Sequence, residues 1–186
     1  MQTISKAIKQ RENFNWAEIE TQLTNKIYDS LTTTLSHSLS LVKEAYLIKD
    51  EKLNVKDLIW QKDGKTIEDR IENYCNEISE LIELSEDPNE QSLKNLFIYN
   101  LTRLLNTETM SLHNKAVYQL VKNKVLYVEI WNEDNECDDH CGCDVYFNRG
   151  KFLVKDLSEL PPYHPDCECY PVYYLKEEEI KNEEQI

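Results

Sequence analysis

The sequence contains only three glycines, Gly64, Gly142 and Gly150, and they lie far apart. A nucleotide-binding loop needs several glycines within a few residues, so the chain has neither a dinucleotide-binding fingerprint nor a P-loop. Apolar runs such as Val125–Val128 stop at about four residues, whereas a membrane helix needs about 20. Residues 1–9 carry no apolar signal-peptide core. We therefore expect a protein that is made in a cytoplasm and does not enter a membrane.

Basic residues are scarce in the last third of the chain. The 186 residues include 21 Lys and Arg against 35 Asp and Glu, and residues 132–186 alone hold 15 acidic and 5 basic side chains. Nucleic-acid affinity depends largely on Lys and Arg that neutralise phosphates, so direct nucleic-acid binding by this third is not expected. Because 40% of the residues are hydrophobic, the chain can still bury a core.

Helical periodicity dominates the first two thirds of the chain. One stripe of apolar residues recurs in steps of three or four, which predicts one face of a long helix: Trp16, Ile19, Leu23, Ile27, Leu31, Leu35, Leu39, Val42 and Tyr46. A second helix is predicted to begin at Thr66, whose hydroxyl can cap the first turn, and to end before Pro88. Its buried positions are predicted to be Ile67, Ile71, Tyr74 or Cys75, Ile78, and Leu81 or Ile82. A third helix is predicted from about Gln91 through Leu105, and whether it continues past Met110 and Val117 to Leu120 is left open by the sequence.

Strand-like composition begins at Val125. Residues 125–131 are rich in β-branched and aromatic side chains and are predicted to form a strand. Residues 145–154 predict two short strands around a turn at Gly150. A last strand is predicted over residues 168–175, at a sheet edge because Pro171 cannot donate a hydrogen bond there.

These patterns predict an α+β fold. An N-terminal helical region with about three long helices occupies residues 1–121. A small antiparallel β unit with a cluster of Cys and His follows over residues 122–176, and residues 177–186 form an acidic tail.

Five of the six cysteines lie between residues 137 and 169. Two loops that each supply thiols on either side of a hairpin are typical of a tetrahedral structural zinc site. The predicted ligands are Cys137, Cys141, Cys167 and Cys169, with His140, Cys143 and His164 as alternates. Because the spacing, Cys-x3-Cys-x-Cys and then Cys-x-Cys, is irregular, reduced cysteines packed in the core and a disulfide remain alternatives.

Catalytic interpretations of the same cluster have less support. The His-x-Glu motif of zinc deaminases and the His-Glu-x2-His motif of metalloproteases are absent. A cysteine nucleophile beside His140 or His164 would lie in acidic surroundings, which raise the pKa of a thiol and weaken it as a nucleophile. We therefore expect no catalytic residues and no enzymatic activity.

Four separated pieces of the chain share an order and spacing with one known family. Residues 160–169 read Leu-Pro-Pro-Tyr-His-Pro-Asp-Cys-Glu-Cys. The others are residues 60–71, with Trp, Asp-Gly-Lys and Arg-Ile; residues 103–116, with Arg, Thr-Glu and His-Asn-Lys-Ala; and Trp131 with the acidic loop that contains Cys137. Over about residues 58–173 the chain resembles the phage Mu F-like minor head proteins, also called head morphogenesis proteins, whose signature is Pro-Pro-x-His-Pro-x-Cys-Arg-Cys.

Two positions depart from that pattern. Glu168 stands where the family usually has Arg, and Cys137 and Cys141 are one residue further apart than the usual Cys-x2-Cys unless His140 takes the second ligand position. Both departures concern the predicted metal ligands more than the family.

The resemblance implies a minor capsid protein of a tailed phage or prophage. Such a protein would associate with the portal and other capsid proteins, act in head assembly or DNA ejection, and reside in the virion after assembly in the host cytoplasm. Two alternatives remain. One is a zinc-stabilised cytoplasmic adaptor, and the other is an ADP-ribosyltransferase-like toxin or enzyme, for which the abundant Glu is the only sign.

Overall fold

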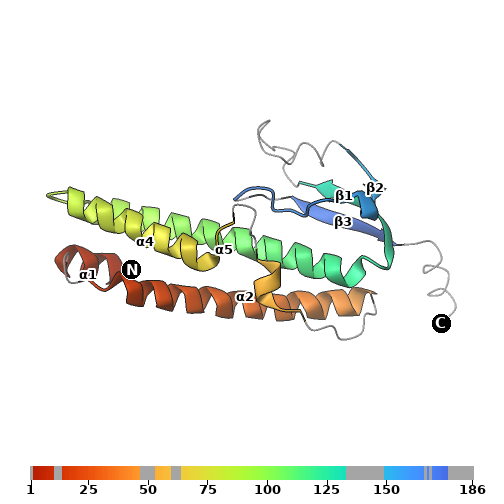
Figure 1. Ribbon diagram of the computed structural model, residues 1–186, viewed down its shortest axis with the longest axis horizontal. Coiled ribbons are helices and arrows are strands. Elements are labelled where there is room, and N and C mark those ends of the chain that lie inside the picture. The colour runs from red at the N-terminus through yellow and green to blue at the C-terminus, as the bar shows by residue number, and fades with distance from the viewer. Residues whose placement is uncertain are drawn as a thin grey trace. The chain divides into compact units, whose positions relative to one another are not determined.

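The computed structural model describes residues 2–10, 14–46, 53–59, 64–132, 149–165, 167 and 169–175. Within these residues the chain is an α+β protein with five α-helices and one three-stranded antiparallel sheet (Figure 1). The elements are α1 (Gln2–Gln10), α2 (Trp16–Tyr46), α3 (Val55–Leu58), α4 (Ile67–Leu84), α5 (Glu90–Val121), β1 (Val125–Trp131), β2 (Phe152–Leu153), the 3-10 helix η2 (Val154–Asp156) and β3 (Tyr170–Leu175). The predicted fold class and its three long helices are thus confirmed.

The chain divides into two compact units, and α2 and α5 contribute to both. The first unit comprises residues 1–30 and 61–106, and the second comprises residues 31–60 and 107–186. The sheet and the described cysteines of the predicted zinc site belong to the second unit. No helix among the described residues is both long and apolar enough to span a membrane.

In the first unit, α4 begins where the sequence predicts. Thr66 and Asp69 form a capping box, in which the Thr66 hydroxyl accepts a hydrogen bond from the Asp69 backbone N–H and the Asp69 carboxylate accepts one from the Thr66 N–H. The alternatives left open by the sequence are now decided, since the fully buried positions include Cys75 and Ile82. Leu81 is exposed.

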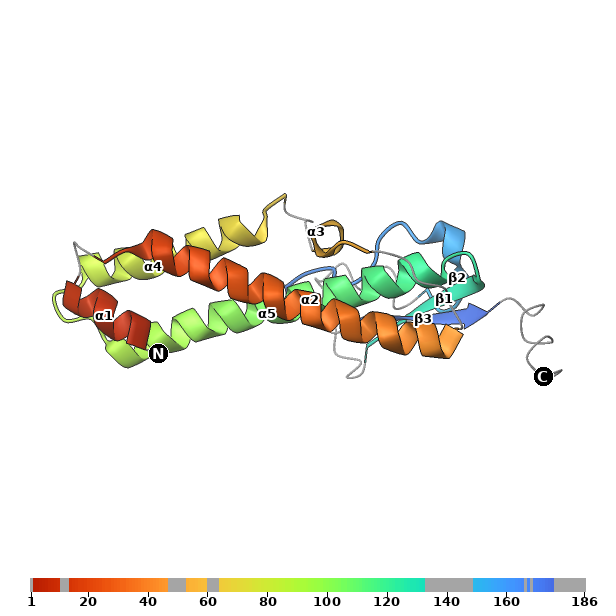
Figure 2. The ribbon, with the colours of Figure 1, turned by 90° about the horizontal axis from the view of Figure 1, so that it is seen from below.

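Helix α1 was not predicted from the sequence. Its Ile4 and Ala7 are buried, and its Ser5 hydroxyl donates to Glu90 Oε1 over 2.6 Å. Figure 2 shows α1 beside the connection between α4 and α5. The two helices of that hairpin are joined by a hydrogen bond from Asn100 Nδ2 to Glu77 Oε2, at 3.0 Å.

In the second unit, β1 is the central strand of the sheet, which has the order β2-β1-β3. Both of its pairings are antiparallel, with Tyr127 opposite Leu153 on β2 and opposite Tyr174 on β3. Among the described residues β3, which contains Pro171, pairs with β1 alone, so the predicted edge position of the last strand is confirmed for this part of the chain. Gly150, before β2, has a φ of +62°, as the predicted turn requires. Residues 145–148 of that predicted hairpin lie outside the described residues.

The two faces of the sheet differ in character. Val128 and Ile130 of β1 are buried, and on the same side Tyr173 of β3 stacks on Tyr118 of α5, with ring centroids 6.4 Å apart. The C-terminal half of α5 therefore covers this face, as Figure 1 shows. Tyr127 and Trp131 alternate with the buried residues and are exposed.

Candidate functional site

The C-terminal half of α5 buries a row of polar side chains within the second unit. Thr107, Glu108, Ser111 and Asn114 are all nearly inaccessible, and Glu108 is 0% exposed. Residues 107, 111 and 114 follow the i, i+4, i+7 spacing of one helix face. Buried polar groups are costly unless they are hydrogen-bonded, so this row needs partners from other parts of the chain.

Two residues of α5 bind the segment that contains α3. The Ser111 hydroxyl donates to the carbonyl oxygen of Leu58 at 3.0 Å, and Lys115 Nζ donates to the carbonyl oxygen of Ile59. Both carbonyls belong to the end of a four-residue helix, where backbone acceptors lack intrahelical partners. Ser111 and Lys115 thus supply hydrogen-bond donors to the carbonyl oxygens of residues 58 and 59 and fix the chain there.

A third residue of α5 binds the Pro-Pro loop. Asn114 is 1% exposed, and its Nδ2 donates to the carbonyl oxygen of Pro161 at 3.1 Å. Pro161, Pro162 and Tyr163 are buried as well. One helix therefore holds two segments that are about 100 residues apart in the sequence.

The electrostatics of the row centre on Lys115. Burial lowers the pKa of its ammonium group, and the carboxylates of Glu108 and Glu159 act in the opposite direction. On the neighbouring face, His113 Nδ1 lies 3.0 Å from the hydroxyl of Ser38 on α2, and burial lowers the pKa of His113. These groups are engaged with other parts of the protein, which is an arrangement suited to holding chain segments in place.

The described members of the predicted zinc site follow the Pro-Pro loop. His164 Nδ1 donates to the carbonyl oxygen of Pro165 at 2.8 Å, so in the neutral ring the lone pair is on Nε2. The backbone N–H of Cys167 donates to the carbonyl oxygen of His164 at 3.2 Å. This local turn places Cys167 and then Cys169 at the start of β3.

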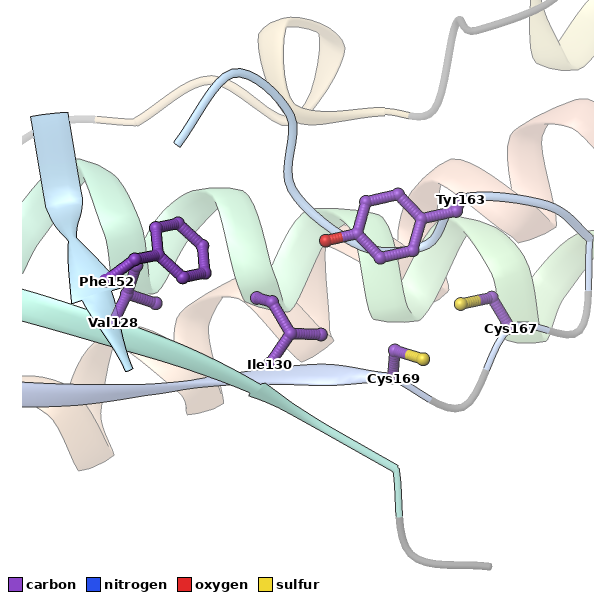
Figure 3. Packing of buried hydrophobic residues seen from close by; sticks show 6 residues of the cluster. All are labelled: Val128, Ile130, Phe152, Tyr163, Cys167 and Cys169. Atoms are coloured by element: carbon purple, nitrogen blue, oxygen red, sulfur yellow. The ribbon is translucent and has the colours of Figure 1, made fainter. Parts of the chain in front are cut away.

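Both thiols lie in the hydrophobic cluster on the covered side of the sheet. Cys167 and Cys169 are buried with four large side chains, namely Val128, Ile130, Phe152 and Tyr163. Figure 3 shows the two sulfur atoms directed into the same space beside the Tyr163 ring. Asn132 Nδ2 approaches Cys169 Sγ at 3.7 Å.

The donor chemistry of this pair suits zinc, because two thiols converge from one loop. Cys137, His140, Cys141 and Cys143 lie outside the described residues. Among the residues that the structure does describe, no group of three or more Cys, His, Asp or Glu is placed to hold a metal. The structural zinc and its ligand set therefore stay predictions.

The contacts made by Ser111, and those between Ser38 and His113, were not predicted from the sequence. The sequence held a signal for the Ser111 contact, since Thr107, Ser111 and Asn114 are three polar residues at the spacing of one helix face. The partners of Ser111 and Asn114 are backbone carbonyls, and residue types do not reveal which carbonyls will be bound.

Comparison of the chain with models of known protein families, with curated proteins and with solved structures found no match.

Proposed function

We propose that the protein is a minor capsid protein of a tailed phage or prophage, associated with the portal and acting in head assembly or DNA ejection. The supporting observation is that three of the four pieces that resemble the Mu F-like family, those with Asn114, Trp131 and Pro161, lie together in the second unit. Asn114, from the His-Asn-Lys-Ala piece, donates to Pro161 of the Pro-Pro piece. Trp131, from the third piece, pairs with Tyr170 directly after the Cys-x-Cys motif.

The segment just before the Trp and Asp-Gly-Lys piece is also held by α5. Leu58 and Ile59 directly precede residues 60–71, and their carbonyl oxygens accept from Ser111 and Lys115. If the short motifs resembled the family by chance, there would be no reason for them to lie close together in the structure. Their contact supports the interpretation that they form one structural unit.

The polar row of α5 and the Pro-Pro loop also support a structural role over a catalytic one. Ser111, Asn114 and Lys115 bind backbone carbonyls, and the His164 ring donates to the carbonyl of the next residue in its own loop. The predicted zinc, if bound through Cys167 and Cys169, would tie the Pro-Pro loop to its neighbours, because structural zinc contributes directly to folding energy.

The test is quantitative mass spectrometry of purified, DNA-filled particles from the producing strain, with isotope-labelled peptides of this chain and of the portal subunit. We expect a low and reproducible ratio of this chain to portal. In parallel, the purified chain should bind isolated portal rings. Absence from filled particles together with no portal binding would overturn the proposal and favour the cytoplasmic adaptor.

A matched pair of variants sharpens the test. Asn114→Ala breaks the contact between two motif pieces, whereas Asn76→Ala changes an exposed asparagine on α4. In a strain that lacks the native gene, the Asn76→Ala protein should enter particles at the wild-type ratio and the Asn114→Ala protein should not. Equal incorporation of both variants would show that the motif contact is irrelevant to particle entry.

A further inference from the structure

The exposed face of the sheet carries a set of aromatic side chains around one carboxylate. On β1, Tyr127, Glu129 and Trp131 alternate with the buried residues, and Trp131 is 47% exposed. The register places Tyr127 opposite Tyr174 and Trp131 opposite Tyr170 on β3. Two aromatic cross-strand pairs therefore flank Glu129 on the side of the sheet away from α5.

Glu129 is held as a fixed carboxylate between these pairs. The Tyr174 hydroxyl donates to Glu129 Oε2 at 2.7 Å. Hydrogen bonds from the side chains of Tyr174 and Trp131 lower the pKa of the Glu129 carboxyl, and the charge of Lys151 acts in the same direction. The face thus presents a negative charge whose two neighbours are aromatic rings.

One of the two aromatic pairs already holds a cation from the same chain. The Lys151 ammonium lies 3.4 Å from the centroid of the Tyr174 ring and 5.8 Å from that of Tyr127. Cations within about 6 Å of an aromatic ring are attracted by its quadrupole. Within the described residues, no lysine or arginine is placed over the rings of Trp131 and Tyr170.

Charge complementarity selects the occupant of the second pair. The chain has a net charge of −14, which repels phosphate backbones and attracts basic segments. Arginine is favoured over lysine at such a place, because its planar guanidinium can stack on an aromatic ring while it donates to a carboxylate.

We propose that the exposed sheet face formed by Glu129, Trp131 and Tyr170 is a docking site for an arginine-bearing segment of a partner protein. The guanidinium stacks on the pair of Trp131 and Tyr170 and donates to Glu129. Its place on these rings is analogous to that of the Lys151 ammonium on the neighbouring pair of Tyr127 and Tyr174. This inference holds whether or not the partner is a capsid protein, so it does not depend on the proposed function.

The test uses the full chain, labelled with nitrogen-15, and a blocked hexapeptide of sequence Gly-Arg-Gly-Gly-Arg-Gly. The chain has three tryptophans, so three indole N–H signals are expected, and Trp131→Phe identifies the one of interest. We expect the Trp131 signal to shift saturably with the peptide while the other two stay in place. The same peptide with citrulline for arginine, which is nearly isosteric and uncharged, should leave the Trp131 signal unchanged.

Matched charge variants separate this site from the general acidity of the protein. Glu129→Gln should weaken peptide binding at least tenfold, and Glu80→Gln, the same change at an exposed site on α4, should weaken it less than twofold. Tyr174→Phe, which keeps the ring and removes the hydroxyl that holds Glu129, should weaken it severalfold. The two unchanged indole signals in each variant report that the fold is intact.

Four outcomes would overturn the proposal. They are no shift of the Trp131 signal at peptide concentrations of several millimolar, equal shifts of all three indole signals, an equal response to the citrulline peptide, and equal weakening by Glu129→Gln and Glu80→Gln.

Discussion

Replacing Asn114 by alanine tests whether the polar row of α5 fixes the Pro-Pro loop. The substitution removes the donor to the Pro161 carbonyl, and Pro161 is buried. A buried acceptor left without its partner costs ~1–3 kcal/mol. The loss of a well-packed amide adds to that cost because it leaves a cavity. We therefore expect the free energy of unfolding to fall by about 2–3 kcal/mol.

The assay is urea unfolding followed by far-UV circular dichroism, with the m-value checked for constancy between variants. Asn76→Ala, at an exposed site on α4, is the control and should change stability by less than about 0.5 kcal/mol. Asn114→Asp keeps the size of the side chain but turns an acceptor toward the Pro161 carbonyl, so it should destabilise at least as much as Asn114→Ala. A loss below about 0.5 kcal/mol for Asn114→Ala would refute the reasoning.

Four further predictions follow from local contacts and from burial. Thr66→Ala should cost about 1 kcal/mol in urea unfolding because it removes a helix cap, while Thr66→Ser should retain most of it. The Thr66 hydrogen bonds lower the pKa of Asp69, so the stability difference between wild type and Asp69→Asn should be full above the ordinary Asp pKa of about 4 and should be lost as the pH falls through the lower pKa of the folded state. Burial lowers the pKa of His113, so as the pH falls through about 6.5 the unfolded chain gains a proton at a higher pH than the folded chain does. Stability should therefore fall between pH 7 and pH 5, and it should fall less in His113→Gln than in the wild type. Burial raises the pKa of the Cys75 thiol to about 12, so iodoacetamide at pH 8 should label Cys75 at least tenfold more slowly in the folded chain than in urea. Peptide mass spectrometry measures the two labelling rates, and equal rates would contradict the burial of Cys75.

The long helices could be predicted from the sequence because their signals are local and repeated. The stripe from Trp16 to Tyr46 coincides with α2 at both ends, and the capping residue Thr66 marks the start of α4. The first strand was predicted with its bounds for the same reason, since residues 125–131 place β-branched and aromatic side chains together. Periodicity and capping are properties of neighbouring residues.

Elements that depend on distant partners were not predicted. Helix α1 has nine residues, and isolated helices of that length are marginal in water; its Ile4 and Ala7 gain stability only by burial in the first unit. The four-residue helix α3 is likewise held by Ser111 and Lys115 from α5. No local sequence pattern in residues 53–59 predicts those hydrogen bonds.

The candidate site was predicted in part. Sequence spacing identified His164, Cys167 and Cys169 as a group, and the structure places the two cysteines together in one buried cluster. It did not identify the backbone carbonyls of Leu58 and Pro161 as partners of α5, because every residue carries a carbonyl and only the fold selects which ones are bound.

The loop that carries the two buried thiols is fixed by protein contacts alone at three places, and this determines what zinc removal should do. Asn114 holds its start at Pro161, the N–H of Cys167 closes a turn on His164, and Tyr170 pairs with Trp131 directly after Cys169. Small zinc domains without such contacts unfold when the metal is removed. If the predicted zinc binds through Cys167, a chelator such as EDTA should leave the far-UV circular dichroism of the chain unchanged at 25 °C and lower only the midpoint of thermal unfolding, by more in wild type than in Cys167→Ser. Loss of the helical and sheet signal on chelation would show that metal, and not the polar row of α5, organises the second unit.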